Sequence, residues 1–225
     1  LRSADTVVEE ISHYVRSHPE AELVFFQDSV FGFHREWAER FAEIYPRRVG
    51  VPFWCYAHPS SCKPEIIQAL RRAGARYIVM GLQSGSQRTL REDYHRHTPL
   101  ERIVESVRMI QASGATLVVD LIISNPFETE DDYRETLEMM LSLPHEYILH
   151  DVFHLTVARN HPIHRKFQEH LIPVAWAPGQ NLGHAVPTPD YTFWRAILTL
   201  TQFSSLDDDV LRAMSRDPWL REHPD

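Results

Sequence analysis

The sequence predicts an α/β fold of mainly parallel strands. Amphipathic helix patterns alternate with short, continuous apolar runs, which are typical of strands buried on both faces of a parallel sheet. This alternation fits either a barrel-like (β/α) sheet or a doubly wound sheet. The barrel is favoured because the dinucleotide fingerprint is absent and polar residues gather at strand ends, as they do at a barrel mouth. These residues are Gln27, Asp28, Ser29, Tyr56, His58, Gln83, Ser84, Ser124 and Asn125.

The first part of the chain is expected to open with a helix. Thr6 and Glu9 have capping-box spacing, and apolar residues then recur at helical intervals up to Pro19. The elements expected next are a strand at 23–26, a helix with Trp37, Phe41 and Ile44 on its inward face, a strand at 52–57 and a helix at 64–73. Gly74 follows this helix at the C-cap, where a positive φ is favoured.

The same pattern then repeats. The expected elements are a strand at 77–82, a helix at 100–113 followed by Gly114, a strand at 116–123, a helix capped by Thr129 and Asp132 that runs to Pro144, and a strand at 147–155. From Trp176 onward, proline and glycine precede two amphipathic segments, around 193–203 and 210–214. We therefore expect a core over residues 1–175 and a linker with a C-terminal helical appendage over 176–225.

Composition restricts the class of protein. A chain of 225 residues, 43% hydrophobic and 24% charged, can bury one large domain or a domain with an appendage. Its net charge of -8 disfavours nucleic acid as the main partner, although a local basic patch is compatible with it. The apolar run 117–123 is interrupted by Asp120 and is far shorter than the ~20 residues of a membrane span. Cys55 and Cys62 form no disulfide framework, so a reducing, cytoplasmic setting is expected.

Asp120 is the strongest local anomaly, because burying a carboxylate within an apolar strand costs several kcal/mol unless it is paired or hydrogen-bonded. It is interpreted either as a structural ion pair or helix-terminus contact inside the barrel, or as a ligand contact. Gln83 and Arg96 have similar alternatives, since strand-end amides often bond to neighbouring backbone and arginines in polar runs are usually solvated.

Histidine pairs raise the hypothesis of a metal site, which geometry weakens. His150 and His154 would share one face of a strand, but ~13 Å apart at ~3.3 Å per residue. His161 and His164 flank Pro162 at an expected helix start, without a third ligand. No metal ligand is therefore assigned in this chain.

Three motifs occur in a specific order. They are Phe26-Gln-Asp-Ser-Val-Phe31, Gly81-Leu-Gln-Ser-Gly-Ser86 and Asp120-Leu-Ile-Ile-Ser-Asn-Pro-Phe-Glu-Thr129, with Tyr94-His-Arg-His-Thr98 between the last two. In order and spacing they resemble the endings of the second, fourth and fifth strands of the radical S-adenosylmethionine (SAM) superfamily, in particular its cobalamin-binding branch. The resemblance covers most of the chain.

The resemblance implies a partial (β/α) barrel whose mouth holds SAM against a four-iron, four-sulfur cluster. By the family pattern, Gln83 and Asp120 contact the ribose hydroxyls and Arg96 pairs with the methionyl carboxylate. These assignments are chemically sensible, because an amide and a carboxylate accept hydroxyl hydrogen bonds and a guanidinium suits a carboxylate.

The remaining site residues implied by the resemblance surround the same cofactor. Asp28 would lie near the methionyl amino group, and Ser84 belongs to the cofactor rim. Ile123 and Asn125 match the fifth-strand motif that supports the adenine, and Glu128 would fix the turn.

The chain departs from the family pattern in two ways. Gln83 stands where many members have glutamate, and Asn125 where many have glycine. The three cluster cysteines, spaced CxxxCxxC, are absent, and Cys55 and Cys62 cannot replace them in number, spacing or place. The cluster ligands and the first strand are therefore expected upstream of Leu1.

The implied function is that of a radical SAM enzyme. With its cluster, the intact enzyme would cleave SAM to methionine and a 5'-deoxyadenosyl radical, using a flavodoxin or ferredoxin-type electron donor and acting on a small-molecule substrate. Cobalamin, bound through an upstream domain, would support methylation or rearrangement, while this chain alone would be inactive. Two alternatives are a non-catalytic scaffold or binding domain that has lost the cluster and a metal-dependent hydrolase built on the histidines and Asp120.

Overall fold

The computed structural model describes residues 2–224, which form two compact units. Unit 1 comprises residues 1–81, 101–119 and 146–148, and unit 2 comprises 82–100, 120–145 and 149–225. A five-stranded sheet has its strands in sequence order: β1 (Val24–Phe25), β2 (Phe53–Ala57), β3 (Ala75–Gln83), β4 (Thr116–Ile123) and β5 (Tyr147–His154). β1 pairs with β2, and β2 with β3, in parallel. The α/β prediction is confirmed, and the expected division at residue 176 stays a prediction.

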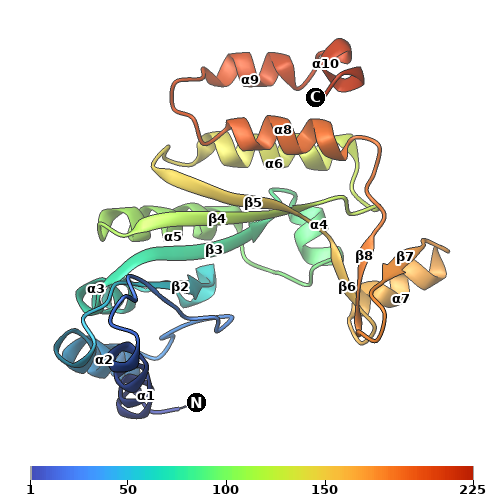
Figure 1. Ribbon diagram of the computed structural model, residues 1–225. Helices are drawn as coiled ribbons and strands as arrows, with labels where there is room; N and C mark the ends of the chain where they lie inside the picture. The colour runs from blue at the N-terminus through green and yellow to red at the C-terminus, as the bar shows by residue number, and fades with distance from the viewer. Residues whose placement is uncertain (1, 225) are drawn as a thin grey trace. The chain divides into compact units, whose positions relative to one another are not determined.

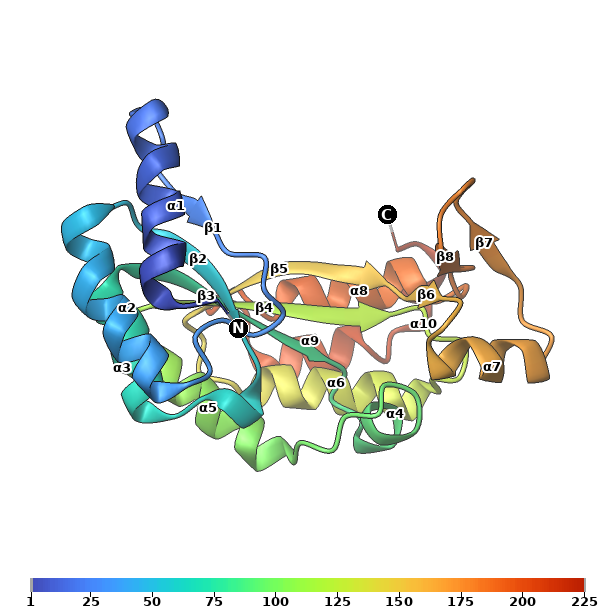
Figure 2. The ribbon, with the colours of Figure 1, turned by 90° about the horizontal axis from the view of Figure 1, so that it is seen from below.

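The helices of unit 1 are α1 (Ala4–Ser17), α2 (Arg35–Arg48), a short 3-10 turn at Pro59–Ser61, α3 (Pro64–Ala73) and α5 (Leu100–Ala112). Figures 1 and 2 show α1 beside α2, and α2 beside α3. α3 has the bounds expected from sequence, and Gly74 ends it with a φ of 111°. The predicted capping box at Thr6 and Glu9 is wrong, because Ser3 precedes the helix and its Oγ accepts from the Thr6 amide at 3.2 Å.

An aromatic cluster forms the core beneath the loop that follows β1. Phe26 and Phe31 stack with ring centroids 4.1 Å apart, and Phe26 meets Phe53 edge-on at 5.3 Å. Phe41 on α2 packs against both Phe26 and Phe53. The Phe31 amide also donates to the Tyr56 carbonyl oxygen at 2.9 Å, which attaches the loop to β2. Residues 26–31 are therefore held at both ends, by the buried rings of Phe26 and Phe31 and by their backbone hydrogen bonds to β2.

Unit 2 contains further elements that the sequence did not predict. They are α4 (Gln87–Glu92) and an antiparallel sheet of β6 (Thr156–Ala158), β8 (Leu182–Ala185) and β7 (Val174–Trp176). Beside β6 lies α7 (Pro162–Glu169), which begins at the helix start expected near His161 and His164. β8 lies in the segment that was expected to be a linker. A separate apolar cluster fills this region, formed by Leu155, Val157, Ile163, Phe167 and Ala185.

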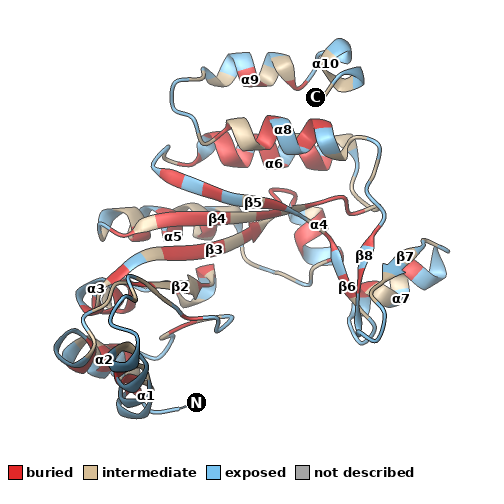
Figure 3. Cartoon of the chain, viewed as in Figure 1, coloured by how far each residue is buried: buried red, intermediate tan, exposed pale blue. Residues whose placement is uncertain are grey.

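Two of the other helices of unit 2 pack against each other, and two shorter helices follow them in the chain. α6 (Glu130–Ser142) lies beside α8 (Tyr191–Leu200), and α9 (Asp208–Met214) lies beside α8, followed by α10 (Pro218–Glu222) (Figure 1). Tyr133 and Trp194 stack between α6 and α8 at 5.5 Å, in the buried part of both helices that Figure 3 shows in red. The predicted cap of α6 is confirmed, since Asp132 Oδ2 accepts from the Thr129 amide at 2.7 Å.

Candidate functional site

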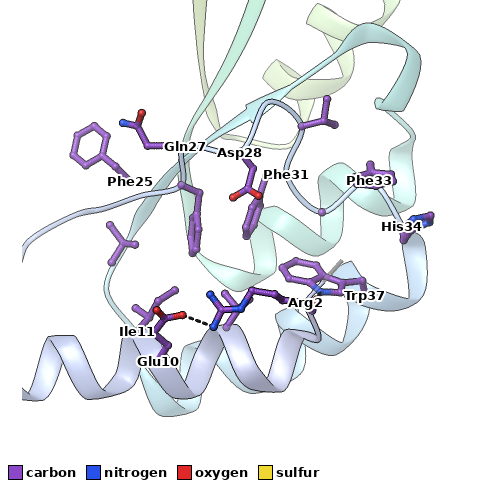
Figure 4. A pocket seen from close by; sticks show the side chains of 15 residues that line it. Arg2, Glu10, Ile11, Phe25, Gln27, Asp28, Phe31, Phe33, His34 and Trp37 are labelled. Carbon is purple, nitrogen blue, oxygen red and sulfur yellow. Dashed lines mark hydrogen bonds and ion pairs between the residues drawn. The ribbon is translucent and has the colours of Figure 1, made fainter. Parts of the chain in front are cut away.

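Unit 1 contains a pocket of about 380 Å³ beside the loop that follows β1. Figure 4 shows the Arg2 side chain between Glu10 on α1, with which it forms an ion pair, and Trp37. Trp37 Nε1 donates to the Arg2 carbonyl oxygen at 2.8 Å, which ties α2 to the segment before α1. Asp28 lines this pocket and is exposed. The Asp28 carboxylate is therefore available to a ligand from the end of β1.

The Gly81–Ser86 motif, which ends β3, continues in unit 2 as a turn fastened to α6. The Gly85 amide donates to Thr136 Oγ1 at 2.9 Å, Ser84 Oγ lies 3.2 Å from the same oxygen, and Ser86 Oγ donates to Asp132 at 2.5 Å. A Cβ at Gly85 would lie 2.5 Å from the Glu135 carbonyl oxygen, so only glycine allows this approach. The glycine and the two hydroxyls thus place the end of β3 against α6.

Gln83 is the last residue of β3 and has both an unfavourable backbone conformation and a buried side-chain oxygen that is unpaired among the described residues. Its φ is +71°, a left-handed conformation that costs a residue with a Cβ roughly 1–2 kcal/mol. Its Oε1 atom is buried and has no hydrogen-bond partner among residues 2–224. Leaving a buried amide oxygen unpaired costs about 1–3 kcal/mol. This oxygen can therefore accept a hydrogen bond from a donor that a ligand brings.

Asp120, on β4, pairs with a residue that the sequence did not connect to it. His150 Nδ1 on β5 lies 3.0 Å from Asp120 Oδ1. The Asp120 side chain is 14% exposed and that of His150 is 45% exposed, so the pair is accessible from the His150 side. Burial raises the pKa of Asp120, while the His150 hydrogen bond acts against that shift. A structural hydrogen bond between Asp120 and His150 is thus present, and a ligand contact at Asp120 stays a prediction.

The turn after β4 rests on a buried polar chain. Asn125 Nδ2 donates to Asp93 Oδ2 at 2.8 Å, and Asn125 Oδ1 accepts from the Phe127 amide at 3.1 Å. Asp93 also pairs with Lys166 on α7, whose ammonium lies 4.1 Å from the Phe127 ring centroid. Ser124, with φ +70°, accepts from the Leu155 amide through Oγ at 3.3 Å. No local sequence pattern pointed to Asp93 or Lys166, because both contacts join segments distant in the chain.

Glu128 and Arg96 are the other charged residues of this region. Ser84 Oγ donates to Glu128 Oε1 at 3.1 Å, and burial raises the pKa of Glu128 to about 8. Arg96 lies on the connection between α4 and α5, where burial lowers its pKa and its amide donates to the Leu90 carbonyl oxygen at 2.7 Å. Ile123 ends β4 with its side chain buried. The roles of these residues toward a cofactor stay predictions.

The two cysteines do not suit an iron-sulfur cluster. Cys55 and Cys62 are 0% and 1% exposed, and burial raises the pKa of both thiols, that of Cys62 to about 11. A cluster ligand must be a thiolate, which this environment opposes. Within residues 2–224, no group of three or more histidine, cysteine, aspartate or glutamate residues is arranged to hold a metal ion. In the same range, every helix is too short or too polar to cross a membrane.

Residues 1–140 match the family model described as the Radical SAM superfamily. The chain is 40% identical over 90 residues to the tRNA-2-methylthio-N(6)-dimethylallyladenosine synthase of Thermus thermophilus, a segment that is 37% of this chain and 18% of that enzyme. It is 25% identical over 175 residues to the enzyme of the same name from Protochlamydia amoebophila, covering 73% of this chain and 38% of the relative. The chain thus corresponds to a minor part of these relatives.

Two solved structures have a similar fold. The cobalamin-dependent SAM radical enzyme OxsB, with aqua-cobalamin and SAM bound, has a TM-score of 0.67 at 14% identity over 99% of this chain and 41% of that chain. The radical SAM methyltransferase TsrM from Kitasatospora setae has a TM-score of 0.61 at 20% identity over 79% of this chain and 36% of that chain. These likenesses confirm the predicted partial barrel, and the family model confirms the resemblance of the motifs to the radical SAM superfamily.

Proposed function

Since the chain belongs to the radical SAM superfamily, we propose that it is the SAM-binding part of an enzyme that generates a 5'-deoxyadenosyl radical. SAM is the source of that radical, and this chain's residues would bind and orient it. The cluster ligands would come from outside Cys55 and Cys62, because both thiols are buried. A flavodoxin or ferredoxin-type donor in the cytoplasm would supply the electron.

The observation that carries this proposal is the unpartnered oxygen of Gln83. A ribose hydroxyl is a donor of the kind that Gln83 Oε1 lacks. Asp120 would accept a second hydroxyl from the neighbouring strand, and Arg96 would pair with the methionyl carboxylate. Asp28, Ser84, Ile123 and Asn125 complete the proposed site at the strand ends.

The likeness to OxsB and TsrM supports a finer proposal, that the intact enzyme also uses cobalamin. Its outcome would then be methylation or rearrangement of a small molecule. The tRNA-modifying relatives match a shorter segment of this chain at higher identity, and their substrate is not a small molecule. The identity of the substrate is therefore a separate question from SAM binding.

Gln83→Leu tests the SAM site with two readouts of opposite sign. Removal of the unpaired oxygen should leave the chain as stable as before or more stable, because an unsatisfied buried group is lost. SAM affinity should fall about fivefold or more, since a neutral hydrogen bond contributes about 1 kcal/mol. Isothermal titration calorimetry with SAM and thermal unfolding, both on the 225-residue chain, provide the measurements.

Gln87→Leu is the matched control, because Gln87 is exposed on α4. It should leave SAM affinity unchanged. Equal SAM affinity in the wild type and Gln83→Leu would overturn the proposed role of Gln83. An intact enzyme that binds SAM and never cleaves it would support the scaffold alternative.

A further inference from the structure

A basic pocket of about 450 Å³ lies at the start of α7, apart from the residues proposed to bind SAM. Four basic side chains line it, Arg159, His161, His164 and Arg165, and we call them the basic pocket residues. Asn160 and Gln168 also line the pocket, whereas no acidic residue does. In a chain with a net charge of -8, this local excess of positive charge indicates a site for an anion.

Arg159 is held in place by an aromatic platform. Its guanidinium carbon lies 3.8 Å from the ring centroid of Trp176, at the end of β7. Trp176 approaches β8 closely at Gly183, where an added Cβ would come within 2.9 Å of the Trp176 ring and 2.6 Å of Val174 Cγ1. Stacking fixes the plane of the guanidinium and leaves its N–H edge free to donate. Neither Arg159 nor Arg165 forms an ion pair with a carboxylate in the described range 2–224.

The two histidines are oriented by backbone contacts. His164 Nδ1 lies 3.0 Å from the Arg159 carbonyl oxygen, which only accepts, so Nδ1 carries a proton. His161 Nδ1 accepts from the Ile163 amide at 3.4 Å, which leaves the proton of a neutral ring on Nε2. His161 therefore presents a donor even when neutral, and His164 presents Nε2, which becomes a donor when protonated.

We propose that the basic pocket residues bind a phosphate group. Two guanidinium groups give the planar, paired donors that phosphate oxygens accept, and His161 adds a single donor beside them. The phosphate group can belong to a phosphorylated small molecule or to the backbone of RNA, which share this chemistry. This site goes beyond the proposed radical function, because none of its residues is assigned to SAM.

The test is calorimetric titration of the 225-residue chain with sodium pyrophosphate at low ionic strength. Saturable binding at one site is expected. Arg159→Gln and Arg165→Gln should each weaken it tenfold or more, because each removes a charge-assisted donor. Trp176→Leu should weaken it severalfold while every charge is retained. Arg108→Gln, an exposed arginine on α5, makes the same charge change elsewhere and should leave affinity unchanged.

A second arm identifies the source of the phosphate. A single-stranded oligouridylate should bind more tightly than pyrophosphate, with a steeper loss of affinity in salt, if the source is RNA. The reverse order assigns a phosphorylated small molecule. Either order supports the site only if the ring signals of His161 and His164 shift in the NMR spectrum of the unmodified chain. Absence of saturable binding, or unchanged affinity in the folded Arg159→Gln/Arg165→Gln variant, would overturn the proposal.

Discussion

Replacement of Lys166 by methionine is the sharpest perturbation of the site region, because it leaves a buried carboxylate without its cation. The Asp93 side chain is 0% exposed and that of Lys166 is 29% exposed. Breaking a buried ion pair from one side costs about 3–5 kcal/mol, and the partial exposure of Lys166 places the expected loss near the lower value, about 3 kcal/mol. Methionine keeps the apolar packing on Phe127, so the loss reports charge rather than volume.

The opposite change should be milder. Asp93→Asn leaves Lys166 able to reach water and keeps an oxygen that accepts from Asn125, so about 1 kcal/mol is expected. The double variant should recover most of the loss caused by Lys166→Met alone and cost only about 1 kcal/mol, which gives a favourable coupling of about 3 kcal/mol. Urea unfolding, monitored by tryptophan fluorescence, measures the free energy of unfolding of the two single variants and the double variant.

Lys63→Met, at the other lysine of the chain, which is exposed, is the control and should cost little. If Lys166→Met were no more costly than Asp93→Asn, the asymmetry worked out from burial would be refuted. Restored stability in the double variant is the result that separates an ion pair from two independent contacts.

Three further predictions concern stability and metal content. Gly85→Ala should lower the free energy of unfolding, measured in urea, by about 1–3 kcal/mol or more, because its Cβ would meet the rigid backbone of Glu135 at 2.5 Å. Unchanged stability would contradict this close approach. Burial raises the pKa of Glu128 from 4.5 to about 8, so its contribution to stability is complete below pH 4.5 and is lost as the pH rises through 8. Glu128→Gln should flatten this pH dependence. Urea midpoints that change in parallel for both proteins from pH 5 to 8.5 would contradict the prediction. Anaerobic reconstitution with iron and sulfide should give the 225-residue chain no stoichiometric cluster, and iron analysis showing four irons that Cys55→Ala/Cys62→Ala abolishes would disprove this.

The main elements were predictable because each carries a local signal. The 64–73 helix and the 116–123 strand have the expected bounds, since a proline start, a glycine end and continuous apolar runs are written in adjacent residues. β6, β7 and β8 are three or four residues long and lack such periodicity. Their pairing depends on register between distant segments, which no local pattern specifies.

The site was predictable in part for the same reason. Asp120 was conspicuous because its neighbours are apolar, but its partner His150 lies 30 residues later on the next strand. The relative register of two parallel strands is set by tertiary packing, so the Asp120–His150 pair could not be predicted from local sequence. The hydroxyls of Ser84 and Ser86 were interpreted as a cofactor rim, and the structure adds their bonds to α6.

The strand order of the main sheet also bears on how the chain is made. Because β1 to β5 are neighbours in the sheet in the order in which they occur in the chain, each new strand joins the edge left by the previous one. No strand has to enter between two that are already paired, as a doubly wound sheet requires where its order reverses. During synthesis the sheet can therefore grow in one direction as successive strands leave the ribosome, and each new strand covers the edge of the strand that paired before it.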